Sequence, residues 1–378
     1  MTTVHVVVPD AFDDPQRPSG GNVYDRRLCE ELARLGRSVR VLRVPGPWPG
    51  SGDGAERALA NVLAGVPDGE VVVIDGLVGS GRPDAVLPHA GRLRLVMLVH
   101  MPLGGVAGDD DAVRVRERAV LERCAVVVTS QWTRRWLEDH YELPPGTVAV
   151  AEPGVDRAEP AAGTLSGRRL LCVGAVSPVK GHDVLVGALA AVQELDWVCT
   201  WVGSTAIDPV FAARTAAAAR RHAIGERIHV LGPLPGAQLA AAYAGADLVV
   251  LPSRAETYGM VVTEALARGL PVVASDVGGV REALGSAGGV EPGVLVRPES
   301  PAALAEALRR WLSDAGWREE LRRRARLRRA GLAAWSVTAQ RVARVVAMSA
   351  GPPLNHVAAA PVLLDRAGHV PRGGVAHG

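Results

Sequence analysis

The chain has 378 residues, of which 48% are apolar and 22% charged, and its formal net charge is +2. This length predicts about two domains of ordinary globular composition. The balanced charge argues against a general nucleic-acid binder. The apolar runs are far shorter than the ~20 residues that a membrane-spanning helix needs, so we expect membrane contact to be peripheral at most. Four widely spaced cysteines and a strand-like rather than leader-like N-terminus predict a cytoplasmic protein.

Short apolar runs alternate with amphipathic stretches of helical length along the chain. The predicted strands of the first half are 4–9, 39–44, 71–75, 93–100, 125–130 and 148–152, and those of the second half are 170–176, 197–203, 228–232, 248–252, 271–275 and 294–297. Nearly continuous Val/Leu/Ile runs are typical of parallel strands covered on both faces. The pattern therefore predicts an α/β fold with two Rossmann-like, doubly wound parallel-sheet domains that face a central cleft.

Breaks in this pattern predict the domain boundaries. Residues 153–167 lack periodicity and indicate a linker between a first domain, 1–155, and a second domain, 156–335. Helical pattern resumes at Pro301 and continues, with a break near Gly316, to about Met348. We expect residues 336–350 to form a helix that packs back on the first domain, and 351–378 to be a mobile tail. The six arginines within 322–329 indicate a solvated helix face, with a membrane or nucleic-acid contact as the alternative.

Lysine is almost absent from this chain. Of the 42 basic residues, Lys180 is the only lysine. A compact ammonium and a guanidinium fork are not equivalent, so its retention suggests that position 180 needs the ammonium. Chance retention on a surface loop is the alternative interpretation.

The most informative segment is 251–279, LPSRAETYGMVVTEALARGLPVVASDVGG. A buried strand ends at Pro252, a turn carries Glu256, Tyr258 and Gly259, and a helix then runs to about Arg268. The free N–H groups at the start of a helix suit a phosphate-bearing ligand, and a glycine lets the backbone approach it. A capping glutamate followed by an ordinary surface glutamate is the alternative.

This segment resembles the donor site of the retaining family 4 glycosyltransferases, which have the GT-B fold. The resemblance implies that Glu256 contacts the donor sugar, that the backbone of Gly259, Met260 and Val261 holds sugar and phosphate, and that Glu264 binds the ribose. Tyr258 lies in the same loop, and Arg254 could reach a phosphate.

A second segment, 170–185 (LLCVGAVSPVKGHDVL), is similar to the part of this family that grips the donor diphosphate. Lys180 matches the family's lysine, and a fixed cation there would stabilise the leaving nucleoside diphosphate. The family's arginine is replaced by Ala175, so Ser177, Arg254 or a backbone donor must compensate, or the donor is held differently.

Two further loops follow predicted strands of the first domain. The loop 18–28 (PSGGNVYDRRL) places Gly20 and Gly21 between a strand and a helix, where a plain turn is the alternative to a ligand loop. The resemblance implies that Gly21 faces the donor phosphates and that Gly20, Asn22 and Tyr24 contact the acceptor. His100 ends the strand 93–100 and, by the same resemblance, lies near the reacting sugar and the acceptor. Ser130 occupies a similar position after the next strand.

Several catalytic motifs are absent from the sequence. There is no GxxxxGK[ST], no HExxH and no GxSxG, and we interpret Asp109 to Asp111 as a helix cap rather than a metal site. We therefore expect no metal and no cofactor besides the nucleotide-sugar co-substrate, a UDP-sugar before a GDP-sugar by the family's usage. Glu282, after two glycines, is expected to support the donor loop.

Together these features predict a retaining glycosyltransferase in which His100, Lys180 and Glu256 are catalytic and the acceptor is a small molecule with a hydroxyl group. Three alternatives remain. A sugar-nucleotide 2-epimerase shares the fold but would need a different set of acid/base residues, which the sequence does not show. A retaining disaccharide phosphorylase would use the same site with phosphate as acceptor. A non-catalytic sugar-nucleotide-binding protein would fit the loss of arginine at Ala175.

Overall fold

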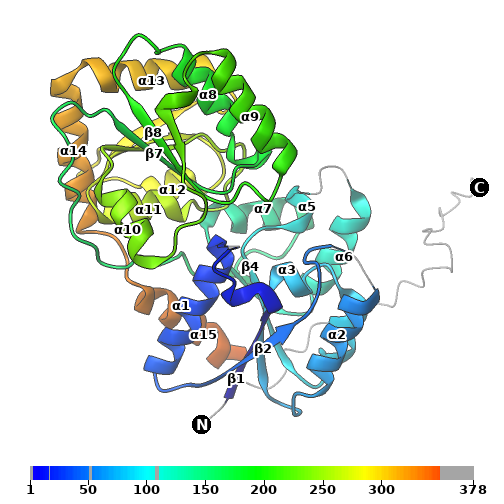
Figure 1. Ribbon diagram of the computed structural model, residues 1–378. Coiled ribbons are helices and arrows are strands. Elements are labelled where there is room, and N and C mark those ends of the chain that lie inside the picture. The colour runs from blue at the N-terminus through cyan, green and yellow to red at the C-terminus, as the bar shows by residue number, and fades with distance from the viewer. Residues whose placement is uncertain (1–2, 17, 51–52, 107–109, 350–378) are drawn as a thin grey trace, which may run out of the picture.

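The structure is a computed structural model that describes residues 3–16, 18–50, 53–106 and 110–349. It contains two separate six-stranded sheets, each wholly parallel and each flanked by helices (Figure 1). The predicted α/β architecture with two Rossmann-like domains is thus confirmed. The expected tail, 351–378, lies outside the described residues.

The first sheet has the order β2-β1-β3-β4-β5-β6 and the second has the order β12-β11-β10-β7-β8-β9. All the predicted strands are present, with ends that differ by up to three residues. The strands of the first sheet are β1 (Thr3–Pro9), β2 (Ser38–Val44), β3 (Val71–Asp75), β4 (Arg94–Val99), β5 (Ala125–Val128) and β6 (Val148–Val150). Those of the second are β7 (Arg169–Val173), β8 (Val198–Val202), β9 (Ile228–Val230), β10 (Leu248–Leu251), β11 (Val272–Ser275) and β12 (Gly293–Val296).

Helices cover both faces of each sheet, which is why the central strands are continuous apolar runs. The helices of the first domain are α1 (Gly20–Arg34), α2 (Asp53–Ala64), α3 (Gly76–Gly79), α4 (Pro83–Val86), α5 (Leu103–Val106), α6 (Asp111–Leu121) and α7 (Gln131–Tyr141), with 3-10 turns η1 (Asp10–Asp13) and η2 (Leu87–His89). Those that follow are α8 (His182–Ala190), α9 (Pro209–Arg221), α10 (Gly236–Ala244), α11 (Met260–Ala267), α12 (Val280–Leu284), α13 (Pro301–Ser313), α14 (Ala315–Arg329) and α15 (Trp335–Ser349), with turns η3 (Pro178–Lys180) and η4 (Gly225–Arg227). Asp110 caps α6 by accepting hydrogen bonds from the N–H groups of Ala112 and Val113.

The chain crosses between the domains twice. It passes forward through the extended segment after β6 and returns after α14, so that α15 packs beside α1 on the first domain (Figure 1). Trp335, Val342 and Val346 of α15 join the core formed by β1 and α1. The two crossings are paired where the N–H of Val155 donates to the carbonyl of Ala333 at 2.9 Å.

The C-terminal helices differ from the expectation in their breaks. The first break lies at Asp314, which caps α14 by accepting from the N–H of Trp317, rather than at Gly316. A second break lies at residues 330–334, where the chain returns to the first domain, and α15 then begins at Trp335, one residue before the expected helix 336–350.

The arginines of α14 are not simply a solvated face. Arg322 donates to the carbonyl of Thr164 in the linker, and Arg329 donates to the carbonyls of Ala158 and Ala267. The expected solvated face is therefore corrected in part, because these side chains fasten the linker to the second domain. In the described part of the chain, no helix is long and apolar enough to cross a membrane.

Candidate active site

The order of the strands predicts where each sheet offers a binding crevice. In the first sheet the direction of winding reverses between β1 and β3, and in the second it reverses between β7 and β10. Ligands of such sheets bind beyond the carboxyl ends of the strands at this reversal. Gly20 and Gly21 follow β1, Lys180 follows β7, and Glu256 follows β10. The sequence-predicted residues therefore gather at both crevices.

Lys180 and Glu256 form an ion pair. The Lys180 Nζ lies 2.5 Å from Glu256 Oε1, which also accepts a hydrogen bond from the Ser253 hydroxyl at 2.9 Å. The Lys180 side chain is 31% exposed and that of Glu256 only 12%. Since each charge neutralises the other, the pair leaves no buried charge without a partner, while the ammonium stays accessible from one side.

Arg254 holds the loop that carries Lys180. Its guanidinium makes a bidentate contact with Asp183 at 2.9 and 2.8 Å and a further contact with Glu299 at 2.8 Å. It also donates to the Pro178 carbonyl at 2.6 Å. Because these acceptors engage the guanidinium fully, Arg254 is placed to position the loop rather than to offer a free cation to phosphate. Ser177, by contrast, makes no side-chain hydrogen bond with any described residue.

The donor loop packs tightly on its neighbours. Gly259, with φ of +95°, precedes the first residue of α11, so the free N–H groups of Met260 and Val261 begin that helix. Gly278 has φ of +55°, and a Cβ there would lie 1.6 Å from the carbonyl oxygen of Glu256. The neighbouring N–H of Gly279 donates to this same carbonyl at 3.0 Å. Glycine is thus required at position 278 to set the height of the Glu256 loop.

Glu264 lies on α11, half-buried, and accepts a hydrogen bond from the Tyr243 hydroxyl at 2.6 Å. Burial raises the pKa of its carboxyl, and the Tyr243 hydrogen bond opposes that rise. Tyr243 is fully buried and so fixes one carboxylate oxygen of Glu264. The other oxygen has no hydrogen-bond partner among the described residues.

The N-terminus of α1 faces the N-terminus of α11 across the cleft. A Cβ at Gly20 would lie 3.5 Å from the Met260 sulfur, and one at Gly21 would lie 3.2 Å from the His100 ring. The Asn22 side chain donates to the carbonyl of Ala11. The N-termini of α1 and α11 thus lie close together, and Lys180 pairs with Glu256 in the loop that leads into α11; free N–H groups and an ammonium both favour a ligand with several negative charges.

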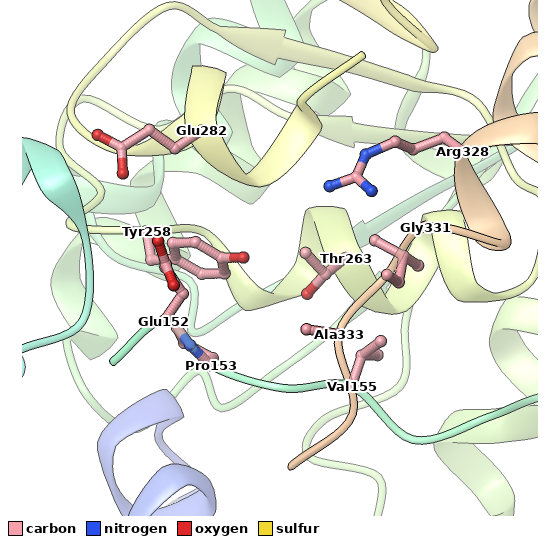
Figure 2. Close-up of a pocket in the computed structure, with 10 residues that line it drawn as sticks. Glu152, Pro153, Val155, Tyr258, Thr263, Glu282, Arg328, Gly331 and Ala333 are labelled. Carbon is pink, nitrogen blue, oxygen red and sulfur yellow. The ribbon is translucent and has the colours of Figure 1, made fainter. Parts of the chain in front are cut away.

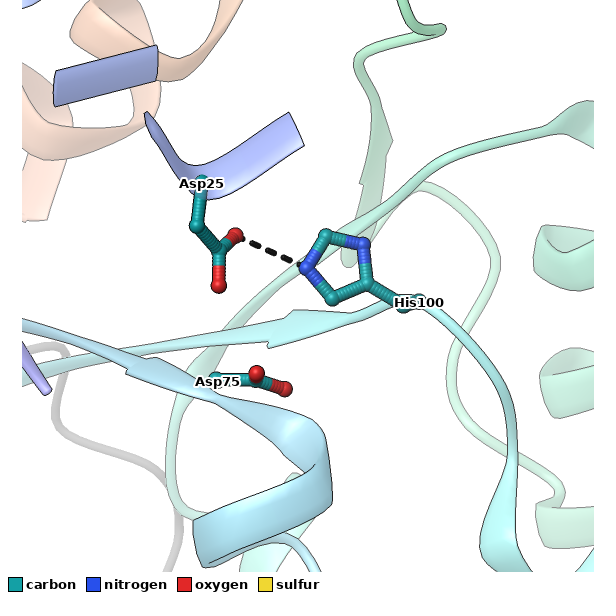
Figure 3. Close-up of side chains that lie close together, drawn as sticks. All are labelled: Asp25, Asp75 and His100. Atoms are coloured by element: carbon teal, nitrogen blue, oxygen red, sulfur yellow. Dashed lines mark hydrogen bonds and ion pairs between the residues drawn. The ribbon is translucent and has the colours of Figure 1, made fainter. Parts of the chain in front are cut away.

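His100 belongs to a buried cluster that the sequence analysis missed. His100 Nε2 lies 2.8 Å from Asp25 Oδ1. One carboxylate oxygen from each of Asp25 and Asp75 and one ring nitrogen of His100 all lie within 4.8 Å of one another (Figure 3). Burial alone would lower the pKa of His100, but the charge and hydrogen bond of Asp25 and the charge of Asp75 raise it to about 9. Burial and the Asp25 charge raise the pKa of Asp75 to about 7. The acidic end of the VVVID strand was the available signal for Asp75; Asp25 offered none.

Two expected acceptor contacts are corrected by the structure. Tyr24 is buried, with its hydroxyl bonded to the Ala151 carbonyl at 2.8 Å and its ring against His100 and Trp335. Ser130 is also buried and caps α7 by accepting from the N–H of Thr133 at 3.0 Å. Neither side chain reaches the cleft, because both face the core side of the loops that carry them.

Glu282 bridges the two domains instead of supporting the donor loop alone. Its Oε2 accepts from the N–H of Gln131, the first residue of α7, at 2.7 Å, and its Oε1 lies 3.3 Å from Arg135. A carboxylate at a helix N-terminus is stabilised by the free N–H groups and the helix dipole. Glu282 therefore joins α12 of the second domain to α7 of the first.

A cavity of about 180 Å³ lies at the hinge and not beside Lys180 (Figure 2). Glu152 to Val155 and Gly331 to Ala333, from the two crossings, form part of its wall. Tyr258 and Arg328 point into it, whereas the Glu282 carboxylate points away (Figure 2). Tyr258 is thus turned to the hinge side of its loop, so its side chain is not placed for the expected donor contact.

Comparisons with known proteins decide the family. Residues 163–328 match the model of the family described as "Glycosyl transferases group 1". The D-inositol 3-phosphate glycosyltransferase of Corynebacterium aurimucosum is 30% identical over 345 residues, which cover 81% of this chain and 78% of that protein. The chain belongs to the group 1 glycosyltransferases. The matched part contains Lys180, Glu256 and Glu264, so this group 1 chain carries its two predicted donor segments inside the family's own domain.

Other group 1 relatives match over less of their length. The D-inositol 3-phosphate glycosyltransferase of Salinispora tropica is 36% identical over 248 residues, 57% of this chain but only 50% of that protein. The chain thus spans about half the length of that relative. The crystal structure of Anabaena HepE, in complex with UDP and glucose, superimposes with a TM-score of 0.73 at 19% identity and covers 92% of this chain and 100% of that one. This likeness establishes the GT-B fold for the group 1 chain.

Proposed function

We propose that this chain transfers a sugar from a nucleotide sugar to the hydroxyl group of a small acceptor, with retention of anomeric configuration. The Lys180–Glu256 ion pair beyond the carboxyl ends of β7 and β10, together with the neighbouring N-termini of α1 and α11, is the observation that supports this proposal most directly. A nucleoside diphosphate carries its negative charge where Lys180 and the free N–H groups of both helices are placed. UDP is the first nucleotide to test, since HepE was crystallised with UDP and glucose.

The proposed chemistry needs three changes of bonding. The bond between the sugar's anomeric carbon and the phosphate oxygen breaks, and the acceptor oxygen bonds to that carbon on the same face. The acceptor's proton passes to the departing phosphate oxygen. Lys180 stabilises the charge that grows on the leaving diphosphate, which lowers the barrier because this charge is larger in the transition state than in the bound donor.

Donor binding would exchange the partners of the ion pair. In the structure Lys180 and Glu256 neutralise each other. In our proposal the diphosphate takes the Lys180 ammonium, and Glu256 turns its oxygens to the hydroxyl groups of the sugar. Glu264 would bind the ribose through the oxygen that Tyr243 does not hold. Ser177 and the helix N-termini would supply what the arginine absent at Ala175 provides in relatives.

The relatives also suggest which acceptor to test first. Both curated relatives described above are named D-inositol 3-phosphate glycosyltransferases. We therefore place D-inositol 3-phosphate and unphosphorylated polyols at the head of the acceptor panel. Inorganic phosphate belongs in the panel as the acceptor that a phosphorylase would use.

The test is nucleotide release from UDP-, GDP-, ADP- and TDP-sugars, with and without the acceptors and without added metal. We expect one donor to turn over only with acceptor, and the product to keep the donor's anomeric coupling in its proton NMR spectrum. Glu256→Gln should abolish release, whereas the exposed control Glu226→Gln should not. Tight nucleotide binding without turnover of any donor would overturn the proposal and leave a binding protein, with Ala175 as its explanation.

A further inference from the structure

The cluster behind His100 contains more negative charge than its surroundings balance. Asp25 is wholly buried and Asp75 is 3% exposed, so neither carboxylate is solvated. Asp25 Oδ1 contacts His100 Nε2 at 2.8 Å, while Asp25 Oδ2 is buried without a hydrogen-bond partner. Asp75 Oδ1 accepts from the N–H of Leu77 at 2.8 Å. His100 is the only cationic side chain that contacts either carboxylate among the described residues.

Two buried carboxylates with one basic partner favour protonation of that partner. The Asp25 charge disfavours ionisation of Asp75, and the adjacent Asp25 carboxylate favours the charged form of His100. A ligand could reach His100 through Nδ1, the ring nitrogen that does not contact Asp25. His100 Nδ1 has no partner among the described residues and is not enclosed, and 17% of the side chain remains exposed. Figure 3 shows Nδ1 on the side of the ring away from both aspartates.

We propose that Asp25, backed by Asp75, is a positioning residue that keeps His100 protonated on both ring nitrogens and presents its Nδ1–H to the substrate cleft. The substrate atom that meets His100 is then an acceptor of a hydrogen bond, such as a hydroxyl or phosphate oxygen. This second statement rests on the proposed function, whereas the protonation of His100 does not.

The other titratable groups near the cluster do not supply the positive charge that faces the two aspartates. Tyr24, which stacks edge-on against His100, has its hydroxyl bonded to Ala151, and burial and Asp25 raise its pKa. Burial and Asp25 likewise raise the pKa of the Cys29 thiol, one turn further along α1. Arg341 of α15 is paired with Glu152. These neighbours stay neutral or are engaged elsewhere, so His100 balances the aspartates.

The test is an NMR titration of the full-length chain labelled with ¹³C at the histidine Cε1 position. The chain has 10 histidines, and the His100 signal is assigned by its loss in His100→Gln. We expect the wild-type signal to remain that of an imidazolium up to a midpoint near the His100 pKa of about 9. In Asp25→Asn the midpoint should fall to about 6.5 or below, because burial, which lowers the pKa, is then opposed only by Asp75.

Two further variants sharpen the measurement. Asp75→Asn should lower the midpoint by less than Asp25→Asn, since Asp75 does not touch the ring. Asp68→Asn, an exposed carboxyl paired with Arg92, should leave it unchanged. A wild-type midpoint at or below 6.5, or an unchanged midpoint in Asp25→Asn, overturns the proposal. One bound divalent metal per chain whose removal by EDTA moves the His100 signal would also overturn it, since the cluster would then be a metal site.

The pH profile of transfer tests the consequence for the substrate. The alkaline limb of kcat/KM should move toward neutral pH in Asp25→Asn, by at least one pH unit, while the control Asp68→Asn keeps the wild-type limb. An unmoved limb despite a lowered NMR midpoint would overturn the role assigned to Nδ1–H. If no donor is transferred at all, the proposed function fails while the titration still decides the protonation of His100. If Asp25→Asn does not fold, the wild-type and Asp75→Asn titrations suffice.

Discussion

Lys180, the proposed diphosphate ligand, is held by an acidic partner in the structure and does not present a free charge. Its ammonium is held at 2.5 Å by Glu256, and its loop is fixed by the bidentate contact of Arg254 with Asp183. The lysine stem also passes beside Gly174, where a Cβ would lie 3.5 Å from it. The compact ammonium is used in the contact with Glu256, which gives a physical reason for a lysine in a chain that otherwise uses arginine.

Substitution of Lys180 should separate charge from shape. We expect Lys180→Met to lower kcat by roughly 100- to 1,000-fold, the usual cost of removing one group that stabilises transition-state charge. Lys180→Arg should recover only part of this loss, because a planar guanidinium fork presents its charge in a different geometry from the compact ammonium that Glu256 holds. The control is Arg168→Met, an exposed arginine paired with Asp196 at the far end of β7. Steady-state kinetics with a saturating donor provide the measurement, and a fully active Lys180→Arg would contradict the argument from shape.

At single residues the sequence located strand ends well and side-chain directions poorly. Lys180 and Glu256 follow strand ends, and the structure brings them into contact. Ser130 follows the end of β5 and Tyr24 lies near the start of α1, yet both are buried in the core. Asp25 could not be foreseen, since its partner His100 lies 75 residues away and nothing local marks the contact.

Among the elements, the strands were predictable because a strand buried on both faces needs apolar residues at nearly every position, which gives a continuous apolar run. The start of the last helix was predicted within one residue, but the hydrogen bond from the N–H of Val155 to the carbonyl of Ala333, which holds the turn before it, was not, because it joins segments far apart in the sequence. For the same reason the arginines of α14 were taken for a solvated face. Their acceptors are carbonyls of the linker, which a sequence pattern does not display.

The turn before α12 packs directly against the backbone of the Glu256 loop. At Gly278 in this turn, any side chain would clash with the Glu256 carbonyl. Gly278→Ala should destabilise the fold by about 3 kcal/mol, since a left-handed backbone angle and a backbone clash act together. Gly288→Ala is a matched control, with φ of +60° but no atom within 4 Å of the added Cβ. It should cost only about 1 kcal/mol. Urea unfolding measures both, and equal losses would show that the contact with Glu256 carries no energy.

The contact between α12 and α7 is expected to favour the closed arrangement of the domains. Glu282→Gln keeps the shape of the side chain but removes the charge that the N-terminus of α7 stabilises, a loss of about 1–2 kcal/mol. Small-angle scattering should show a larger radius of gyration, and the KM for the donor should rise. Glu291→Gln, which removes an exposed carboxylate paired with Arg281, should change neither quantity. An unaltered radius of gyration in Glu282→Gln would mean that the other contacts across the cleft suffice for closure.

For the whole molecule, the buried His182 and the partly exposed His100 give the stability opposite responses to pH. His182, beside Lys180, is fully buried, and burial lowers its pKa to about 4. The unfolded chain takes up this proton more readily, so stability is lost as pH falls from about 6.5 toward 4. Asp75, with its pKa raised to about 7, acts in the other direction over much of this range. On the acid side these two groups therefore largely cancel.

At alkaline pH no second group among the described residues offsets the contribution of His100 to the free energy of unfolding. Its pKa of about 9 in the folded chain, against an ordinary value of 6.5, makes a contribution that is complete below pH 6.5 and is lost as pH rises through 9. At about 1.4 kcal/mol per pKa unit, the expected loss is about 3 kcal/mol. Urea unfolding between pH 6 and 9.5 should show this decline in the wild type, a much flatter profile in His100→Gln, and an unchanged decline in the exposed control His222→Gln. A flat wild-type profile would mean that Asp25 and Asp75 do not stabilise a charged His100, which would remove the electrostatic reason for burying both aspartates at the edge of the cleft.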